Sequence, residues 1–112
     1  MADKTAAIIR PAPVVLVTGG AKRLGAAICR AFVRSGWRVA CHYGQSQAEA
    51  LALQAETGAV PVHGDLTTEA GRLALFDQVI ETMGTLHTVV NNASAFEPDT
   101  GLAFNPALAE RQ

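Results

Sequence analysis

Short apolar runs alternate along this chain with longer stretches in which apolar residues recur every three or four positions. The first run, residues 14–17, is continuously apolar and mostly β-branched, which is typical of a strand covered on both faces of a sheet. Strands that alternate with helices in this way favour a parallel sheet with right-handed crossover connections. The sequence therefore predicts an α/β fold that begins βαβαβαβ around a doubly wound parallel sheet.

Caps and glycines give the expected boundaries, because a glycine commonly follows the last turn of a helix. We expect strands at 14–17, 37–43, 59–63 and 86–90, and helices that begin at Arg23, after the N-cap Ser46, and after Thr67 or Thr68. Apolar residues at helical spacing are Leu24, Ile28 and Ala31, then Ala48, Leu51 and Ala55, then Leu73, Phe76, Ile80 and Met83. A flavodoxin-like sheet with a different function fits the same pattern of strands and helices. The residues of the loops must therefore indicate the function.

The composition indicates one globular domain over residues 13–112, after a flexible tail at 1–12. Apolar residues make up 49% of the chain, charged residues 17%, and the formal net charge is -1. This balance offers no basic stripe for nucleic acid and no polybasic membrane patch. The apolar patch at 6–9 is too short for a signal peptide, so we expect a cytoplasmic protein. Cys29 and Cys41 are expected to be buried, reduced thiols.

A glycine-bearing turn, TGGAKRLG at residues 18–25, joins the first strand to the first helix. Glycines there allow a tight turn, a close backbone approach and close packing of the helix on the strand. The unpaired N–H groups of the helix start favour a pyrophosphate, although a purely structural turn is the alternative. The predicted contacts with a nucleotide in this turn are Gly19, Lys22, Arg23 and Leu24.

The octet resembles the TGxxxGxG turn of the short-chain dehydrogenase/reductase family, with Arg23 in place of the second glycine. Its form TGxxKRLG is similar to the pteridine reductase branch, in which this arginine lies beside the cofactor phosphates and the substrate. The resemblance covers roughly residues 13–112. It implies the N-terminal part of a Rossmann-type fold, a small-molecule substrate, and a homo-oligomer for the full-length member. A charge-assisted bond from Arg23 to phosphate can replace the lost backbone approach.

The second strand ends without the carboxylate that an NAD-preferring site needs for the ribose hydroxyls. No Asp or Glu occurs at residues 40–48, so a 2′-phosphate meets no repulsion there. The segment His42-Tyr43-x-x-Ser46 resembles the pteridine reductases, which often carry Arg where this chain has Gln45. We therefore expect NADPH, with Tyr43 beside it. The candidate donors to the 2′-phosphate are Lys22, His42 and Ser46.

Two more segments match family positions that contact the cofactor. Asp65 and Leu66, after the third strand, match the position that contacts the adenine ring. An aspartate that only starts the turn into the next helix is the alternative. Asn91, Asn92 and Ala93 match the NNAG motif, which in the family lies alongside the ribose and nicotinamide. Ligands bind outside the carboxyl ends of parallel strands, so this placement also agrees with the fold.

The string NNASAF at residues 91–96 looks like the NNASxF of pteridine reductases. In that branch the serine contacts the pterin and the phenylalanine stacks on it. The resemblance thus implies that Arg23, Ser94 and Phe96 bind a pterin substrate, whereas Phe96 as a plug of the sheet edge is the alternative. A 3-oxoacyl or sugar carbonyl reductase of the same family is the second candidate.

The proton chemistry of the family uses a tyrosine followed four positions later by a lysine. Here the one tyrosine is Tyr43 and the lysines are Lys4 and Lys22, so we assign no catalytic residue. We expect a fragment of an NADPH-dependent oxidoreductase that is inactive alone, or else a non-catalytic NADP-binding module. His63 and His87 are expected to be structural.

Overall fold

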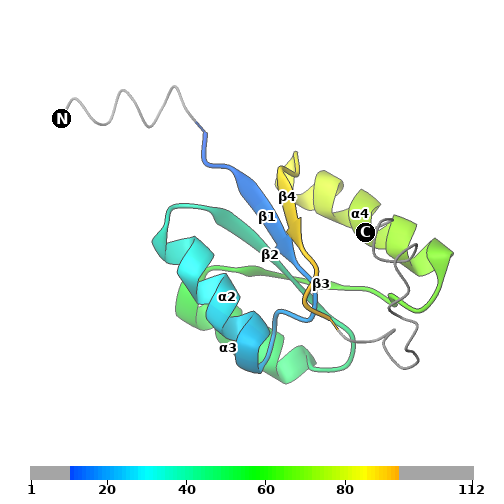
Figure 1. Ribbon diagram of the computed structural model, residues 1–112, viewed down its shortest axis with the longest axis horizontal. Coiled ribbons are helices and arrows are strands. Elements are labelled where there is room, and N and C mark those ends of the chain that lie inside the picture. The colour runs from blue at the N-terminus through cyan, green and yellow to red at the C-terminus, as the bar shows by residue number, and fades with distance from the viewer. Residues whose placement is uncertain (1–10, 94–112) are drawn as a thin grey trace.

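The computed structural model describes residues 11–93, which form a four-stranded sheet with helices on both faces (Figure 1). Neighbouring strands are all parallel and follow the order β3-β2-β1-β4. This topology confirms the expected front portion of a doubly wound α/β sheet. The strands are β1 (Val14–Val17), β2 (Arg38–Tyr43), β3 (Val60–His63) and β4 (Thr88–Val90).

Helices cover both sides of β1, one of the two interior strands of the described sheet. Its odd-numbered residues pack in the core cluster under two helices and its even-numbered residues in the cluster under the third. All four side chains are fully buried, as their continuous apolar character predicts. None of the described helices is long and apolar enough to cross a membrane. The first two helices are α2 (Arg23–Arg34) and α3 (Gln47–Thr57), and the third is α4 (Glu69–Met83).

The helix ends agree closely with the sequence signals. Gly58 and Gly84 follow α3 and α4 in the left-handed conformation, each with φ of 87°. Thr68 caps α4, since its hydroxyl accepts a hydrogen bond from the Gly71 amide at 2.9 Å. Ser46 is the N-cap residue of α3, but its side chain makes no capping hydrogen bond. The largest difference is in β4, which begins at Thr88, two residues later than expected.

The helix faces that meet the sheet differ from the apolar spacing read in the sequence. In α2 the contact is centred on the small residues Gly25 and Ala26, because the helix starts directly against the turn. In α4 two apolar stripes adjoin, and only one packs on the sheet. The exposed residues are Leu24, Leu51, Leu73, Phe76 and Ile80, whereas Cys29, Leu53, Leu75, Val79 and Met83 are buried.

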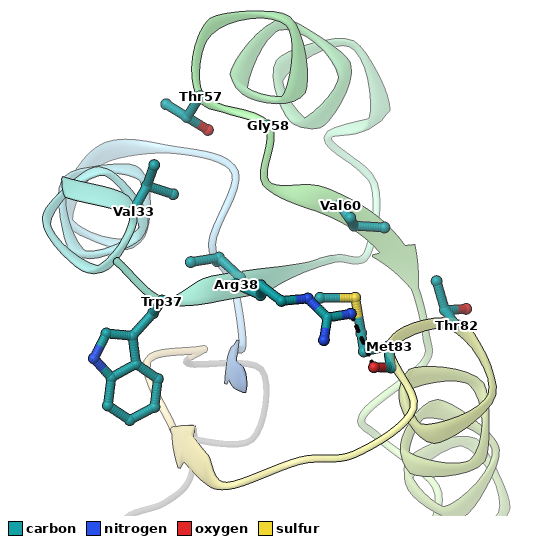
Figure 2. A pocket seen from close by; sticks show the side chains of 9 residues that line it. Val33, Trp37, Arg38, Thr57, Gly58, Val60, Thr82 and Met83 are labelled. Atoms are coloured by element: carbon teal, nitrogen blue, oxygen red, sulfur yellow. Dashed lines mark hydrogen bonds between the residues drawn. The ribbon is translucent and has the colours of Figure 1, made fainter. Parts of the chain in front are cut away.

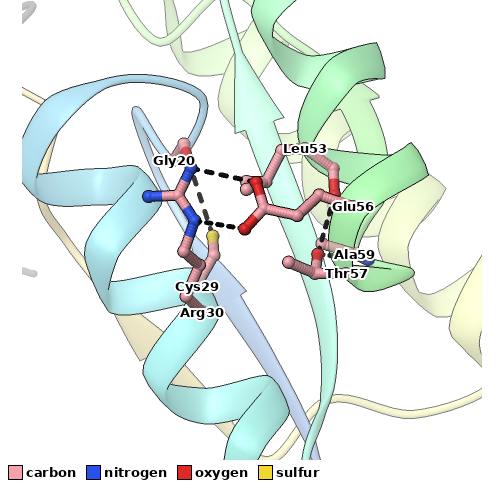
Figure 3. Close-up of polar contacts among 7 residues, drawn as sticks. All are labelled: Gly20, Cys29, Arg30, Leu53, Glu56, Thr57 and Ala59. Atoms are coloured by element: carbon pink, nitrogen blue, oxygen red, sulfur yellow. Dashed lines mark hydrogen bonds and ion pairs between the residues drawn. The ribbon is translucent and has the colours of Figure 1, made fainter.

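Polar contacts join α2 to α3 and to the turn before it (Figure 3). Arg30 forms a two-pronged ion pair with Glu56, with N···O distances of 2.7 and 3.0 Å. The Cys29 thiol donates to the Gly20 carbonyl at 3.6 Å. Its hydrogen bond with Cys41 and its burial raise the pKa of the Cys29 thiol. Both cysteines are free and buried, as expected.

Candidate functional site

The carboxyl ends of β1 and β4 meet at one edge of the sheet, where the order of the strands reverses. The helix that follows β1 lies on one face and the helix that precedes β4 lies on the other (Figure 1). Such a switch point leaves a crevice in which α/β proteins bind ligands. The structure brings two predicted site residues together here, because the Asn92 side-chain amide donates to the Gly19 carbonyl at 3.1 Å.

Thr18 is the centre of this junction and was not among the predicted contacts. Its hydroxyl oxygen accepts from the backbone amides of Asn92 at 2.9 Å and Ala93 at 3.0 Å. The hydroxyl proton can be donated to the Val90 carbonyl or to the Asn91 side chain, at 3.3 and 3.2 Å. One buried threonine therefore fixes the segment after β4 against the turn after β1. In the sequence, the position of Thr18 at the start of the glycine turn is the signal that could have indicated this role.

The glycines of the turn are required by close contacts. Gly19 has φ of 61°, and a β-carbon there would lie 3.0 Å from the Ala93 Cα. A β-carbon on Gly25 would collide with the Gly19 carbonyl oxygen and lie 2.8 Å from the Gly20 Cα. The turn is therefore pressed against both α2 and the end of β4, which leaves its outer side for a ligand.

Two positively charged residues lie at the start of α2, where no side chain caps the helix. Lys22 is the N-cap residue, no side chain caps the helix, and its first turn carries no acidic residue. Arg23 follows with φ of 54°, a left-handed backbone that glycine adopts far more readily than arginine. Both side chains are exposed, and neither pairs with another side chain within residues 11–93. Because the helix dipole is also positive here, the site favours an anion.

His42 has a different role from the one expected. Its ring is only 3% exposed, with Nδ1 accepting from the Gly19 amide and Nε2 donating to the Gly64 carbonyl, both at 2.9 Å. Burial lowers the pKa of the ring, so the imidazole is neutral at neutral pH. Neither nitrogen remains for a 2′-phosphate. The expected donor role of His42 is thus corrected, because the ring serves the backbone instead.

The other residues expected near the ribose lie at the end of β2. Tyr43 is half-buried, and its ring is 5.3 Å from that of His63. Ser46 is half-buried at the start of α3, and its hydroxyl is not used as a helix cap. It therefore remains a candidate ligand of a phosphate, together with the helix start behind it.

The predicted adenine contacts lie in the loop between β3 and α4. Asp65 Oδ1 accepts from the amide and the hydroxyl of Thr67, at 2.9 and 2.6 Å, and these bonds lower the pKa of the carboxyl. Asp65 thus starts the turn into α4, as the alternative interpretation proposed, and its side chain is exposed at the carboxyl end of β3. The Leu66 side chain is buried in the core, while its carbonyl accepts from Arg72 at 2.8 Å. Any contact of Leu66 with a nucleotide must therefore be through its backbone.

Ser94 and Phe96, the predicted substrate contacts, lie outside the described residues. Within residues 11–93, no group of three or more His, Cys, Asp or Glu side chains could hold a metal ion. A cavity of about 270 Å³ lies instead at the amino ends of the strands (Figure 2). Arg38 in its wall donates to the Met83 carbonyl at 2.9 Å, at the negative end of the α4 dipole. Since α3 also ends there, the helix dipoles make this cavity less favourable for a phosphate than the start of α2.

Three features occur at the same edge of the sheet. They are the reversal of strand order, the close-packed glycine turn, and the start of α2 with its two exposed cations. Together they define an α/β protein with a dinucleotide-binding type of crevice. Residues 13–111 match the family described as short chain dehydrogenase. The chain belongs to this family, as its glycine turn indicates.

Several characterised members of the family are similar to this chain. L-fucose dehydrogenase of Mus musculus is 42% identical over 86 residues, which are 76% of this chain and 31% of that protein. Pteridine reductase 1 of Leishmania tarentolae is 36% identical over 110 residues, with 78% of this chain and 38% of that protein covered. Acetoacetyl-CoA reductase of Paracoccus denitrificans is 37% identical over 82 residues, which cover 73% and 34%. The chain spans about a third of the length of these relatives.

Proposed function

We propose that this chain forms the NADPH-binding part of a short-chain oxidoreductase that reduces a pterin. The observation that carries the proposal is the pair of exposed cations, Lys22 and Arg23, at the uncapped start of α2. A helix start with added positive charge and no acidic partner is a strong site for a phosphate. The glycine turn beside it packs closely against the end of β4, since a β-carbon on Gly19 would lie 3.0 Å from the Ala93 Cα, and its outer side faces the start of α2.

Each part of the nucleotide has a candidate partner around this crevice. The amides of Arg23 and Leu24 and the Arg23 guanidinium hold the pyrophosphate, because α2 lacks an internal partner for its first N–H groups. The bound nicotinamide supplies the hydride, and the protein orients it through the fixed segment after β4. The remaining partners are Lys22 and Ser46 for the 2′-phosphate, Tyr43 beside it, Asp65 and Leu66 for adenine, and Asn91, Asn92 and Ala93 for the ribose and nicotinamide.

Binding of NADPH and NADH to the 112-residue chain tests the choice of cofactor. We expect Lys22→Ala and Ser46→Ala each to raise the dissociation constant of NADPH about tenfold, since each removes a charge-assisted bond to the 2′-phosphate. The NADH affinity stays unchanged in Ser46→Ala and falls by a smaller factor than the NADPH affinity in Lys22→Ala, because Lys22 also adds positive charge at the start of α2. Arg34→Ala, at the opposite end of the same helix, is the matched control and alters neither. Equal or tighter binding of NADH by the wild-type chain would overturn the proposal.

The proposed pterin substrate rests on Arg23, Ser94 and Phe96 and on the similarity to pteridine reductase 1. Carbonyl reduction is the second candidate, because L-fucose dehydrogenase and acetoacetyl-CoA reductase are equally similar. Dihydropterin fluorescence in the presence of NADP+ separates the two. Quenching that is lost in Phe96→Ala supports the pterin, whereas competition by a 3-oxoacyl thioester or a sugar supports the carbonyl reductase. We expect binding without turnover, since the chain has no Tyr-x-x-x-Lys.

A further inference from the structure

His42 bonds to the turn after β1 and to the loop after β3, the two strands that pair with β2 on either side. Its ring joins the Gly19 amide to the Gly64 carbonyl, and its own backbone carbonyl accepts from the Gly20 amide at 2.9 Å. Gly19 and Gly20 belong to the turn after β1, whereas Gly64 directly precedes Asp65 in the loop after β3. Both consecutive amides of the turn are therefore directed back to one residue of β2.

The two ring contacts allow only one protonation state. The Gly19 amide is a donor, so Nδ1 must carry a lone pair, and the Gly64 carbonyl is an acceptor, so Nε2 must carry the proton. A second proton on Nδ1 would oppose the Gly19 N–H. The ring is buried with no described acid in contact with it, so the neutral form is also the one that burial favours.

We propose that His42 is a positioning residue, whose neutral imidazole holds the pyrophosphate turn and the adenine loop at one fixed spacing. This inference rests on the proposed NADPH-binding function. With the Gly19 and Gly20 amides directed inward, the turn presents the later amides at the start of α2 to the phosphates. The same ring fixes Gly64, and thereby the neighbouring Asp65. The two halves of the nucleotide site thus form one preorganised unit without any contact between His42 and the ligand.

Loss of this ring leaves the turn and the loop free to adopt other arrangements, so that only a fraction of molecules is ready to bind. The apparent dissociation constant rises by the inverse of that fraction. A buried amide without its partner is unfavourable by an amount that corresponds to about tenfold or more in population. The effect therefore belongs to nucleotide affinity, even though the residue is not a ligand.

His87 provides a matched control. Its Nδ1 accepts from the Val14 amide at 3.0 Å, which is the same kind of bond at the other end of β1, away from the crevice. We expect His42→Phe to raise the NADPH dissociation constant about tenfold and His87→Phe to raise it less than about twofold. His42→Gln keeps one acceptor and one donor, and we expect it to restore most of the affinity. Thermal denaturation shows how far each variant loses stability.

Nitrogen NMR of the wild-type chain reports the protonation state of each ring nitrogen of His42, which is a readout separate from thermal stability. We expect an unprotonated Nδ1 and a protonated Nε2 for His42, with the Gly19 amide signal unchanged in position when His87 is replaced. A protonated Nδ1, or wild-type affinity in a folded His42→Phe chain, would contradict the positioning role of His42 but not the proposed function. Failure of the wild-type chain to bind NADPH would instead contradict the proposed function. If His42→Phe does not fold, the glutamine variant and the ring tautomer decide.

Discussion

Arg23 combines a positive charge, which the proposed phosphate site uses, with a backbone conformation that is unfavourable for a residue with a side chain. Its φ of 54° lies in the left-handed region, which is unfavourable by roughly 1–2 kcal/mol for a residue with a β-carbon. The strain is located at the first residue of α2, beside the proposed phosphates. Local strain of this kind persists where the surrounding contacts over-determine it.

Replacing Arg23 therefore separates stability from binding. We expect Arg23→Gly to increase the free energy of unfolding by about 1 kcal/mol, because glycine adopts this φ freely. The same variant should bind NADPH about tenfold more weakly, since it lacks the guanidinium. Arg23→Ala keeps the strain but loses the charge, so it should weaken binding without a gain in stability. Denaturant unfolding and nucleotide titration measure the two effects, and equal stability of both variants would contradict the assignment of strain.

At the scale of the elements, the strand and helix boundaries could be predicted from the sequence because single residues determine them. Gly58 and Gly84 end helices by adopting left-handed φ, and Thr68 caps α4 through one hydroxyl. The buried helix faces could not be predicted from the sequence, because α4 has apolar residues on two adjoining stripes and only one of them packs on the sheet. The role of His42 was equally hidden, since its partners are 23 and 22 residues away in the sequence.

The approach of α2 to the turn gives an element-scale prediction. Alanine normally stabilises a helix by about 1 kcal/mol relative to glycine, but a β-carbon on Gly25 would lie 2.8 Å from the Gly20 Cα. We expect Gly25→Ala to lower the free energy of unfolding by about 3 kcal/mol, or to abolish folding. Gly44→Ala is the control, because a β-carbon there meets nothing within 4 Å. Denaturant unfolding of both variants checks this, and equal stabilities would contradict the close packing.

At the scale of the whole molecule, the described part leaves an apolar surface uncovered on the α4 side. Phe76 and Ile80 on this helix are 38% and 47% exposed, and Val89 on the edge strand β4 is 42% exposed. Val89 pairs in register with Leu16, whose side chain packs under α4, so both point to the same face of the sheet. Exposed apolar surface beside an open strand edge promotes association between chains.

We therefore expect the purified 112-residue chain to self-associate at micromolar concentration. Phe76→Gln combined with Ile80→Gln should reduce association while leaving the free energy of unfolding within about 0.5 kcal/mol, since both side chains are exposed. Sedimentation velocity over a range of concentrations measures this. Leu75→Gln, in the buried stripe of the same helix, is the contrast and should destabilise the fold. A wild-type chain that remains monomeric throughout would contradict the prediction.

The hydrogen bonds of Thr18 to the segment after β4 also have a consequence that we expect for the order of folding. They join residues 74 and 75 positions apart, whereas β2 follows β1 after a single helix. Closing the longer loop has the higher entropic cost, so β1, β2 and β3 can associate before β4 arrives. The crevice between β1 and β4 is then assembled after the rest of the described sheet. With the nucleotide bound as proposed above, affinity arises only once β4 has joined β1, and binding then stabilises the molecules in which this pairing is complete.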